Sequence, residues 1–313
     1  MRRSTSPRPR QRSWKRALRN ALVCLLAIPV LLFGVIWLRY RVRSTPSPIQ
    51  GQVLFRGAIY DREVRRTPRP LVLHFVTVDL STPGLRFLVT PPEDPKAELP
   101  LKGRTTSAFL QQAGADLAIN GDFFYPWKSN TMLDYYPHVG DPVTVQGYAS
   151  SNGVPYGNNT KRWELPALCF SSDGKASIRA VKVGEKPPHN AVGGDRLLLQ
   201  DGKVTGAAKA SDALHPRTAA ALDRSGKHLL LVIVDGRQAG YSEGATTEEL
   251  ALFLREKGAY TAINLDGGGS AALAVRGRNG MPEVLNSPIN HWYLPHNERV
   301  VANHLGLFAP QKP

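Results

Sequence analysis

The segment "PRTAAALDRSGKHLLLVIVDGR" at residues 216–237 decides the fold, because it holds two apolar runs on either side of an Asp-Arg-Ser-Gly turn. Two such runs predict adjacent strands. The pattern "TEELALFLREKG" at residues 247–258 predicts a helix, with a glycine at its end. The β-branched run "YTAINL" at residues 260–265 predicts a further strand. Residues 229–265 therefore predict a strand, a helix and a strand, with a parallel crossover if both strands share one sheet.

Shorter signals elsewhere in the chain extend this pattern. Apolar runs at residues 71–80 and 85–90 flank "STPG" and predict a hairpin. A second hairpin is predicted around the Asp-Gly turn of residues 167–181. Residues 105–114 predict a short helix, and "DLAIN" at residues 116–120 predicts a buried strand. Strands predominate over helices, which predicts an α+β fold.

Charge is unevenly distributed along the chain. The 313 residues carry 40 Lys and Arg against 25 Asp and Glu, a formal net charge of +15. Residues 1–43 contain 11 of the basic residues and no acid, so the rest of the chain is only mildly basic. A nucleic-acid-binding protein needs a basic face or a stacking motif on its folded part, and the sequence shows neither. A nucleic-acid partner is therefore not predicted.

The uncharged run from Asn20 to Leu38 predicts a membrane-spanning helix. Its length matches the roughly 20 residues that cross a bilayer, and the basic residues before it favour a cytoplasmic N-terminus. A cleaved signal peptide is the alternative, although no small-residue cleavage site follows the run. The predicted architecture is a basic cytoplasmic tail at 1–19, a transmembrane signal anchor at 20–38, a linker at 39–55, and one α+β domain at 56–310 with a mixed, largely antiparallel sheet and flanking helices. The body is then periplasmic or extracellular.

The stretch "INLDGGGSAAL" at residues 263–273 is the strongest candidate for a functional loop. Glycines let the backbone approach a ligand closely, and successive N–H groups can form a concavity that binds oxyanions. A tight turn capped by Asp266 is the structural alternative. A serine hydrolase is a further alternative, because "GGSAA" resembles a nucleophile elbow around Ser270. That mechanism would also need Glu283 and one of three histidines, which are His291, His296 and His304.

A short repeat links this loop to an earlier segment. "AINGD" at residues 118–122 is echoed by "AINLD" at residues 262–266, and each strand ends in Asn-x-Asp. Alternation along a strand places Asn120 with Asp122 on one face, and Asn264 with Asp266 on one face. Carboxylate and amide oxygens suit hard cations, so Asn120, Asp122 and Asp266 form a candidate site for calcium or magnesium.

Several motifs together resemble the phosphodiester glycosidase family. They are "AINGDFF", "HPRTAAAL", "VIVDGRQAGYSEGATTEELALFLREKGA", "INLDGGGSAAL" and "LNSP…NERVVANHLGLF". The resemblance runs in order from about Gly57 to Phe308 and covers nearly all of the body. Two features depart from it: Asp122 stands where many relatives carry a small residue, and residues 125–165 do not match.

The resemblance implies hydrolysis of a sugar-1-phosphodiester at the anomeric carbon, on a glycoconjugate or envelope polymer. Such a site must hold the phosphate, stabilise an oxocarbenium-like state and supply a base or nucleophile. The first candidate for the base or nucleophile is Asp266, followed by Asp235 and Asp122. Arg217 is the predicted phosphate ligand, because its guanidinium can bind two phosphate oxygens at once. The other predicted substrate-binding residues are Thr218, Gly267, Gly268, Gly269, Ser270, Asn120, Asn264, Asn286 and Arg237.

Residues 125–165 are rich in aromatic side chains and show no regular period. The aromatic residues are Tyr125, Trp127, Tyr135, Tyr136, Tyr148, Tyr156 and Trp163. Such rings stack on sugars or anchor a loop to the core, and the segment is interpreted as a lid with one or two stacking residues. The alternative function from another class is a non-catalytic glycan-binding protein that helps to assemble or export an envelope polysaccharide.

Overall fold

The computed structural model describes residues 11–41, 43–131, 134–157, 165–182, 184–210, 213–290 and 295–310. The chain forms two units, Met1–Arg43 and Ser44–Pro313. The first contains helix α1 (Gln11–Arg41), and its segment Arg16–Trp37 is apolar and long enough to cross a bilayer. The apolar helix predicted at residues 20–38 is therefore present. Residues 1–10 of the predicted tail lie outside the described part of the chain.

The folded body begins earlier than predicted. Strand β1 (Ile49–Phe55) pairs antiparallel with β2 (Ala58–Arg65), so the second half of the predicted linker at 39–55 is a strand. Four residues of β1 are exposed, and Gly51 interrupts the strand with a φ of +65°. Because β1 is an edge strand, its apolar pattern is weak, and the boundary predicted at residue 56 falls too late.

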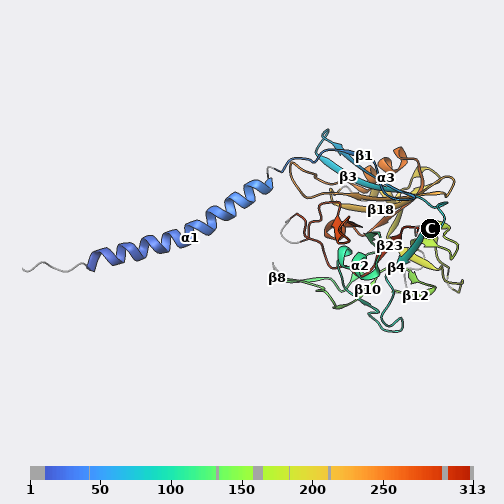
Figure 1. Cartoon of the computed structure of the whole chain (residues 1–313), viewed down its shortest axis with the longest axis horizontal. Coiled ribbons are helices and arrows are strands. Elements are labelled where there is room, and N and C mark those ends of the chain that lie inside the picture. The colour runs from blue at the N-terminus through green and yellow to red at the C-terminus, as the bar shows by residue number, and fades with distance from the viewer. Residues whose placement is uncertain are drawn as a thin grey trace, which may run out of the picture. The chain divides into compact units, whose positions relative to one another are not determined.

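An eight-stranded antiparallel sheet carries strands from both halves of the body, in the order β1-β2-β3-β19-β18-β20-β16-β17. Its remaining strands are β3 (Leu71–Asp79), β16 (Arg196–Gln200), β17 (Lys203–Val204), β18 (Arg217–Asp223), β19 (His228–Val234) and β20 (Ala259–Leu265). β18 and β19 form the predicted hairpin. Because β18 is antiparallel to both β19 and β20, those two strands run parallel but are not neighbours. Helix α3 (Thr247–Glu256) connects them, as predicted (Figure 1).

The body also contains two five-stranded antiparallel sheets. Their strand orders are β22-β21-β6-β23-β4 and β12-β11-β15-β13-β14. Their strands are β4 (Arg86–Val89), β6 (Leu117–Asn120), β11 (Ala149–Ser151), β12 (Val154–Tyr156), β13 (Pro166–Phe170), β14 (Ala176–Ala180), β15 (Asn190–Gly193), β21 (Leu273–Arg276), β22 (Pro282–Val284) and β23 (His304–Phe308). Small sheets are made by β5 (Leu101–Lys102), β10 (Pro142–Val145) and β7 (Phe124–Tyr125), and by β8 (Lys128–Thr131) with β9 (Asp134–Tyr136). The predicted hairpin at 167–181 is confirmed as β13 and β14.

The hairpin predicted across "STPG" is wrong. β3 pairs with β2 and β19 in the large sheet, whereas β4 pairs with β23 in another sheet. The residues between β3 and β4 therefore carry the chain from one sheet to another. Alternating apolar residues predict a strand but do not identify its partner, so the local pattern was the same for both outcomes.

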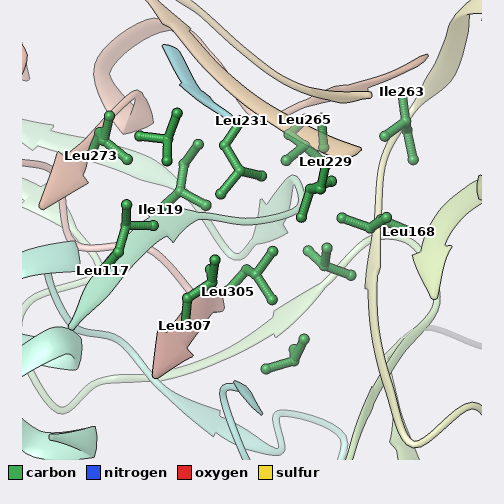
Figure 2. Packing of buried hydrophobic residues seen from close by; sticks show 14 of the residues in the cluster. Leu117, Ile119, Leu168, Leu229, Leu231, Ile263, Leu265, Leu273, Leu305 and Leu307 are labelled. Atoms are coloured by element: carbon green, nitrogen blue, oxygen red, sulfur yellow. The ribbon is translucent and has the colours of Figure 1, made fainter. Parts of the chain in front are cut away.

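The main core lies between the large sheet and the sheet that contains β6, β21 and β23 (Figure 2). β19 contributes Leu229, Leu231 and Ile233 to this core, and its alternate residues Leu230, Val232 and Val234 pack on the opposite face in a second cluster. Helix α3 covers that second face with Leu250, Phe253 and Leu254. Because both faces of β19 are covered, its sequence is continuously apolar rather than alternating.

Capping residues define both short helices, as predicted. Thr246 and Glu249 form a reciprocal capping box at the start of α3, and Gly258 follows the helix with a φ of +85°. Helix α2 (Thr106–Ala113) begins after Thr105, whose side chain accepts from the Ala108 amide, and ends at Gly114 in a left-handed conformation. The prediction of one α+β domain with largely antiparallel sheets and flanking helices is confirmed.

Candidate active site

The candidate residues converge because of the way in which the central strands pair. Arg217 at the start of β18 lies opposite Val234 at the end of β19, and Thr218 lies opposite Leu265 at the end of β20. The residues just beyond those ends, Asp235 and Asp266, therefore occupy the same edge of the sheet as Arg217. Asn120 joins them at the end of β6, where its amide group donates to the Asp266 carbonyl oxygen at 2.6 Å.

Each glycine of the loop is required for a different reason. A Cβ on Gly267 would lie 2.6 Å from the Pro216 carbonyl oxygen. Gly268 has a φ of +59°, and its N–H donates to the same carbonyl at 2.8 Å. A Cβ on Gly269 would collide with the guanidinium of Arg299. The loop is thus packed closely against Pro216 on one side and Arg299 on another, and the Gly268 amide is already used within the protein.

Of the three candidate aspartates, Asp266 is the one that lies in a partly exposed residue position. Its backbone N–H donates to the Gly121 carbonyl oxygen at 3.0 Å. Burial raises the pKa of Asp266 to about 6, against the lowering effects of the Ser270 hydroxyl and the Arg299 guanidinium. Ser270 lies beside the carboxylate but has no partner at full hydrogen-bond geometry. A carboxylate with this pKa is mostly ionised at neutral pH and still basic enough to accept a proton.

Asp122 is buried rather than open to the loop, with 2% of its surface exposed. Its carboxylate accepts from the backbone amides of Phe123 and Gly147, each at 2.7 Å. Burial raises the pKa of Asp122 to about 7, and the neighbouring Asp266 contributes to the rise. Gly147 and Gly193 leave room for this carboxyl group, since a Cβ on either would lie 2.7 Å from its Oδ2.

Asp235 is also buried and is fully engaged by protein groups. It accepts from Asn286 Nδ2 at 3.1 Å and from the Ser287 amide at 3.0 Å, and it bonds His74 Nε2 at 3.0 Å. His74 Nδ1 in turn bonds the hydroxyl of Tyr60 at 2.8 Å. Burial alone would raise the pKa of Asp235, but His74 and these donors outweigh it and hold the pKa below its usual value.

The guanidinium groups of Arg237 and Arg299 contact the glycine loop, and that of Arg217 lies within electrostatic range of Arg237. Arg217 donates to the carbonyl oxygens of Ala245 and Ala213 at 2.8 and 2.7 Å. Arg237 lies against Gly268 and donates to His215 Nδ1 at 3.3 Å, and Arg299 donates to Asn290 Oδ1 at 2.9 Å.

These arginines have neutral hydrogen-bond partners rather than acidic ones. Within the described ranges, none of Arg217, Arg237 and Arg299 has a carboxylate oxygen within 4.0 Å. Burial lowers the pKa of both Arg217 and Arg299, which shows that their charge is poorly solvated. Partly buried cations without a hydrogen-bonded carboxylate in the described ranges favour binding of an anion, and phosphate matches the guanidinium geometry.

Most of the predicted polar ligands hold the backbone of the site in place. Thr218 is fully buried and donates to Asn120 Oδ1 at 3.0 Å, and that oxygen also accepts from the Ala272 amide. Asn286 donates to the Ala271 carbonyl oxygen and accepts from the Leu273 amide, so it fixes the chain just after the loop. Direct sugar contacts by these amides stay a prediction, since their hydrogen bonds already join strand ends.

The proposed cation site is not assembled in this arrangement. Asn120 Oδ1 accepts two protein hydrogen bonds, and Asp122 accepts two backbone amides. In the described part of the chain, no group of three or more His, Cys, Asp or Glu side chains is placed to hold a metal ion. The oxygens proposed as cation ligands thus already accept protein hydrogen bonds, and a calcium or magnesium site at Asn120, Asp122 and Asp266 stays a prediction.

The serine-hydrolase alternative finds no support in the residues that the structure describes. Ser270 is 1% exposed, and its Oγ has no hydrogen-bond partner. His304 is buried on β23 and bonds Thr90 Oγ1 at 3.2 Å. His291 lies outside the described residues. His304 is thus not placed to activate Ser270, as a catalytic triad requires.

Sequence reasoning missed Asp195. Its carboxylate accepts from Asn264 Nδ2 at 2.7 Å and pairs with Arg196, and its charge raises the pKa of both Asp266 and Asp122. The sequence feature that could have identified Asp195 is "GGDR" at residues 193–196, where an aspartate directly follows two glycines. A Cβ on Gly194 would lie 2.2 Å from the Asn264 carbonyl oxygen, so this pair brings Asp195 against the end of β20.

The family and the fold support a glycosidase-type hydrolase. The chain belongs to the phosphodiester glycosidase family, whose model matches residues 113–308. No match was found among curated proteins.

Solved structures share the fold. The zebrafish N-acetylglucosamine-1-phosphodiester α-N-acetylglucosaminidase catalytic domain, auto-inhibited by its pro-peptide, matches with a TM-score of 0.60 and 20% identity over 85% of this chain and 87% of that one. A hypothetical protein from Synechocystis matches with a TM-score of 0.57 and 15% identity, over 81% and 62%. A putative exported protein from Burkholderia pseudomallei matches with a TM-score of 0.52 and 16% identity, over 76% and 74%.

Proposed function

We propose that the body hydrolyses a sugar-1-phosphodiester at the anomeric carbon and releases a free sugar and a phosphate monoester. The observation that carries the proposal is the placement of Asp266, a partly exposed residue, near guanidinium groups whose printed hydrogen bonds go to neutral acceptors. A glycosyl phosphodiester presents the two matching features, an anomeric carbon that becomes positive and a phosphate that carries negative charge.

The proposed reaction breaks the bond between the anomeric carbon and the phosphate oxygen. Asp266 takes a proton from the attacking water, whose oxygen forms the new bond to the anomeric carbon. The bonding electrons leave with the phosphate, whose charge is stabilised by Arg217, Arg237 and Arg299. Phosphate is a better leaving group than a sugar alkoxide, so a dedicated general acid is less important here than in ordinary glycosidases.

Supporting residues would hold Asp266 and the glycine loop in their relative positions. Asn120 and Asn286 bond the backbone on the two sides of the glycine loop, and Asp235 holds Asn286. We assign Asp235 and Asp122 to this buried framework because of their 1% and 2% exposure, and Asp266 to the reacting centre.

The body would act outside the cytoplasm, on a glycoconjugate or envelope polymer. This part of the proposal rests on the apolar segment of α1 and on the basic residues before it. The substrate then lies on the same side of the membrane as Ser44–Pro313.

The test is to supply the full chain in detergent micelles with a glycosyl 1-phosphodiester and measure released sugar. Wild-type protein is expected to release sugar, and Asp266→Asn to reduce turnover by at least about a hundredfold, the usual contribution of a general base. Asp201→Asn is the matched control, because Asp201 lies in an exposed turn with a φ of +53°, which Asn tolerates. Substrate binding without any release by wild-type protein would instead support the glycan-binding alternative.

A further inference from the structure

A recess lined by both five-stranded sheets lies at the end of β23 that points away from the catalytic residues. It has a volume of about 500 Å³, within the roughly 300–1,000 Å³ of typical ligand sites. Its walls come from residues 85–88 at the start of β4, residues 170–174 of the β13–β14 hairpin, and Phe308 at the end of β23. At the start of β23, His304 pairs with Asn120 of the candidate active site. Phe308 therefore lies about 14 Å along the strand from the level of Asn120.

Phenyl rings form the apolar part of this recess. Phe87 of β4 stacks on Phe170 of β13 at a centroid distance of 4.1 Å and an interplanar angle of 16°, and this contact joins the two sheets. Phe170 is buried, whereas Phe87 and Phe308 are partly exposed. The guanidinium carbon of Arg86 lies 4.8 Å from the centroid of the Phe308 ring, which is a cation–π distance. The recess thus presents apolar ring surface next to an exposed planar cation.

The side chain of Asn190 closes the outer edge of β4, which is the last strand of its sheet. Its Oδ1 accepts from the Val89 amide at 3.0 Å, and its Nδ2 donates to the Phe87 carbonyl oxygen at 3.1 Å. The side-chain amide therefore takes the place of a peptide group of a further strand, and Asn190 is 1% exposed. A peptide cannot add to β4 as a new strand here without displacing this buried side chain.

The opposite wall, the turn of residues 171–174, is fixed by its own hydrogen bonds. The Ser171 amide donates to the Lys175 carbonyl oxygen at 3.0 Å, and the Gly174 amide donates to the Ser171 carbonyl oxygen at 3.0 Å. The Asp173 carboxylate pairs with Lys175 Nζ at 2.7 Å. Because both walls are held by protein contacts, the recess has its shape before a ligand enters it.

The rim of the recess is polar but carries little net charge. Arg86 is the one lysine or arginine of the lining and Asp173 the one acid, so their formal charges cancel. Asn152, Ser172 and His189 add an amide, a hydroxyl and an imidazole, and all three residues are exposed. Phosphate groups and nucleic acids favour an excess of positive charge, which this lining lacks. A neutral ligand with several hydroxyl groups and an apolar face fits the lining better.

We propose that this recess is a second binding site, separate from the glycine loop, and that it takes a neutral saccharide. The ring surface of Phe87 and Phe308 suits the apolar face of a sugar, and the planar polar groups of the rim suit its hydroxyl groups. If the body acts on a polymer, as proposed above, the site holds a remote part of that polymer. This last step rests on the proposed function, whereas saccharide binding itself does not require turnover.

The test is calorimetry of the full chain, in a detergent without a sugar head group, with neutral tetrasaccharides of glucose, of mannose and of N-acetylglucosamine. Wild-type protein is expected to bind at least one of them. Arg86→Ala should weaken that binding about tenfold, equivalent to about 1.4 kcal/mol, because a charged hydrogen-bond donor is lost. His189→Ala should weaken it roughly threefold, as expected for a neutral hydrogen bond. Arg224→Ala is the matched control, since Arg224 is also exposed and lies over a ring, that of Tyr260, at 5.2 Å and outside the recess.

Each outcome decides the proposal. The absence of binding by all three tetrasaccharides, or equal affinities of Arg86→Ala and Arg224→Ala, would overturn it. Binding that is weakened by Arg237→Ala and not by Arg86→Ala would assign the saccharide to the glycine loop, which also overturns it. Both exposed-site variants are expected to keep the wild-type Tm, so a loss of affinity reports on the recess. Retained binding by a protein that releases no sugar from a glycosyl 1-phosphodiester would refute the proposed function and leave this site in place.

Discussion

The raised pKa of Asp266 makes the pH dependence of turnover a direct test of its role. If Asp266 accepts the proton of the attacking water, kcat/KM follows its ionised fraction. With a pKa of about 6, that fraction is about a tenth at pH 5 and about nine tenths at pH 7. The expected result is a rise of about tenfold between these values and a plateau above pH 7, measured as sugar released by the full chain.

Two substitutions should move this profile in opposite directions. Ser270→Ala removes a hydroxyl that lowers the pKa of Asp266, so the midpoint should shift upward. Asp195→Asn removes a negative charge that raises the same pKa, so its midpoint should shift downward. A wild-type profile without a rise near pH 6, or midpoints that neither substitution moves, would refute the assignment of Asp266 as the base.

Two further predictions concern the loop and the anchor. Gly267→Ala places a Cβ about 2.6 Å from the Pro216 carbonyl oxygen and should cost about 1–3 kcal/mol of unfolding free energy, seen as a lower Tm. Gly206→Ala is its control, because a Cβ there meets nothing within 4 Å, and equal Tm values for the two variants would contradict the packing argument. The charge distribution around the apolar segment predicts that protease added to cells with a permeabilised outer layer digests residues 44–313, and full protection of the body would show the opposite orientation.

Elements with strong local signals were predictable from the sequence. The capping box of α3, the turn between β18 and β19 and the Asp-Gly turn of β13 and β14 each depend on a few adjacent residues. Strand β1 was missed because it is an exposed edge strand. The error at β3 and β4 has another cause, since strand partners are chosen by packing between distant segments.

The site residues could be predicted only where they lie next to one another in the sequence. Asp266 and its glycines are adjacent, so the sequence identified them together. Arg299 lies 33 positions after Asp266, and no neighbouring residue indicates its role. Asp195 lies 71 positions before Asp266, where only the preceding glycine pair marks it. Conversely, Asn120 and Thr218 were predicted to touch substrate, but the structure shows them bonded to each other. Polar residues at strand ends bind ligands or hold backbone, and burial decides between the two.

The hydrogen-bonded path from Tyr60 through His74 to Asp235 also bears on the boundaries of the functional unit. The segment that matches the family model begins at residue 113, yet Tyr60 and His74 come from β2 and β3, well before it. Without those two strands, a carboxylate that fixes the chain beyond the glycine loop would lose its histidine, and β19 would become an open edge. The N-terminal strands are thus part of the folded domain rather than a spacer between it and helix α1. In this chain the domain that carries the family segment therefore begins at least as early as β2 and β3.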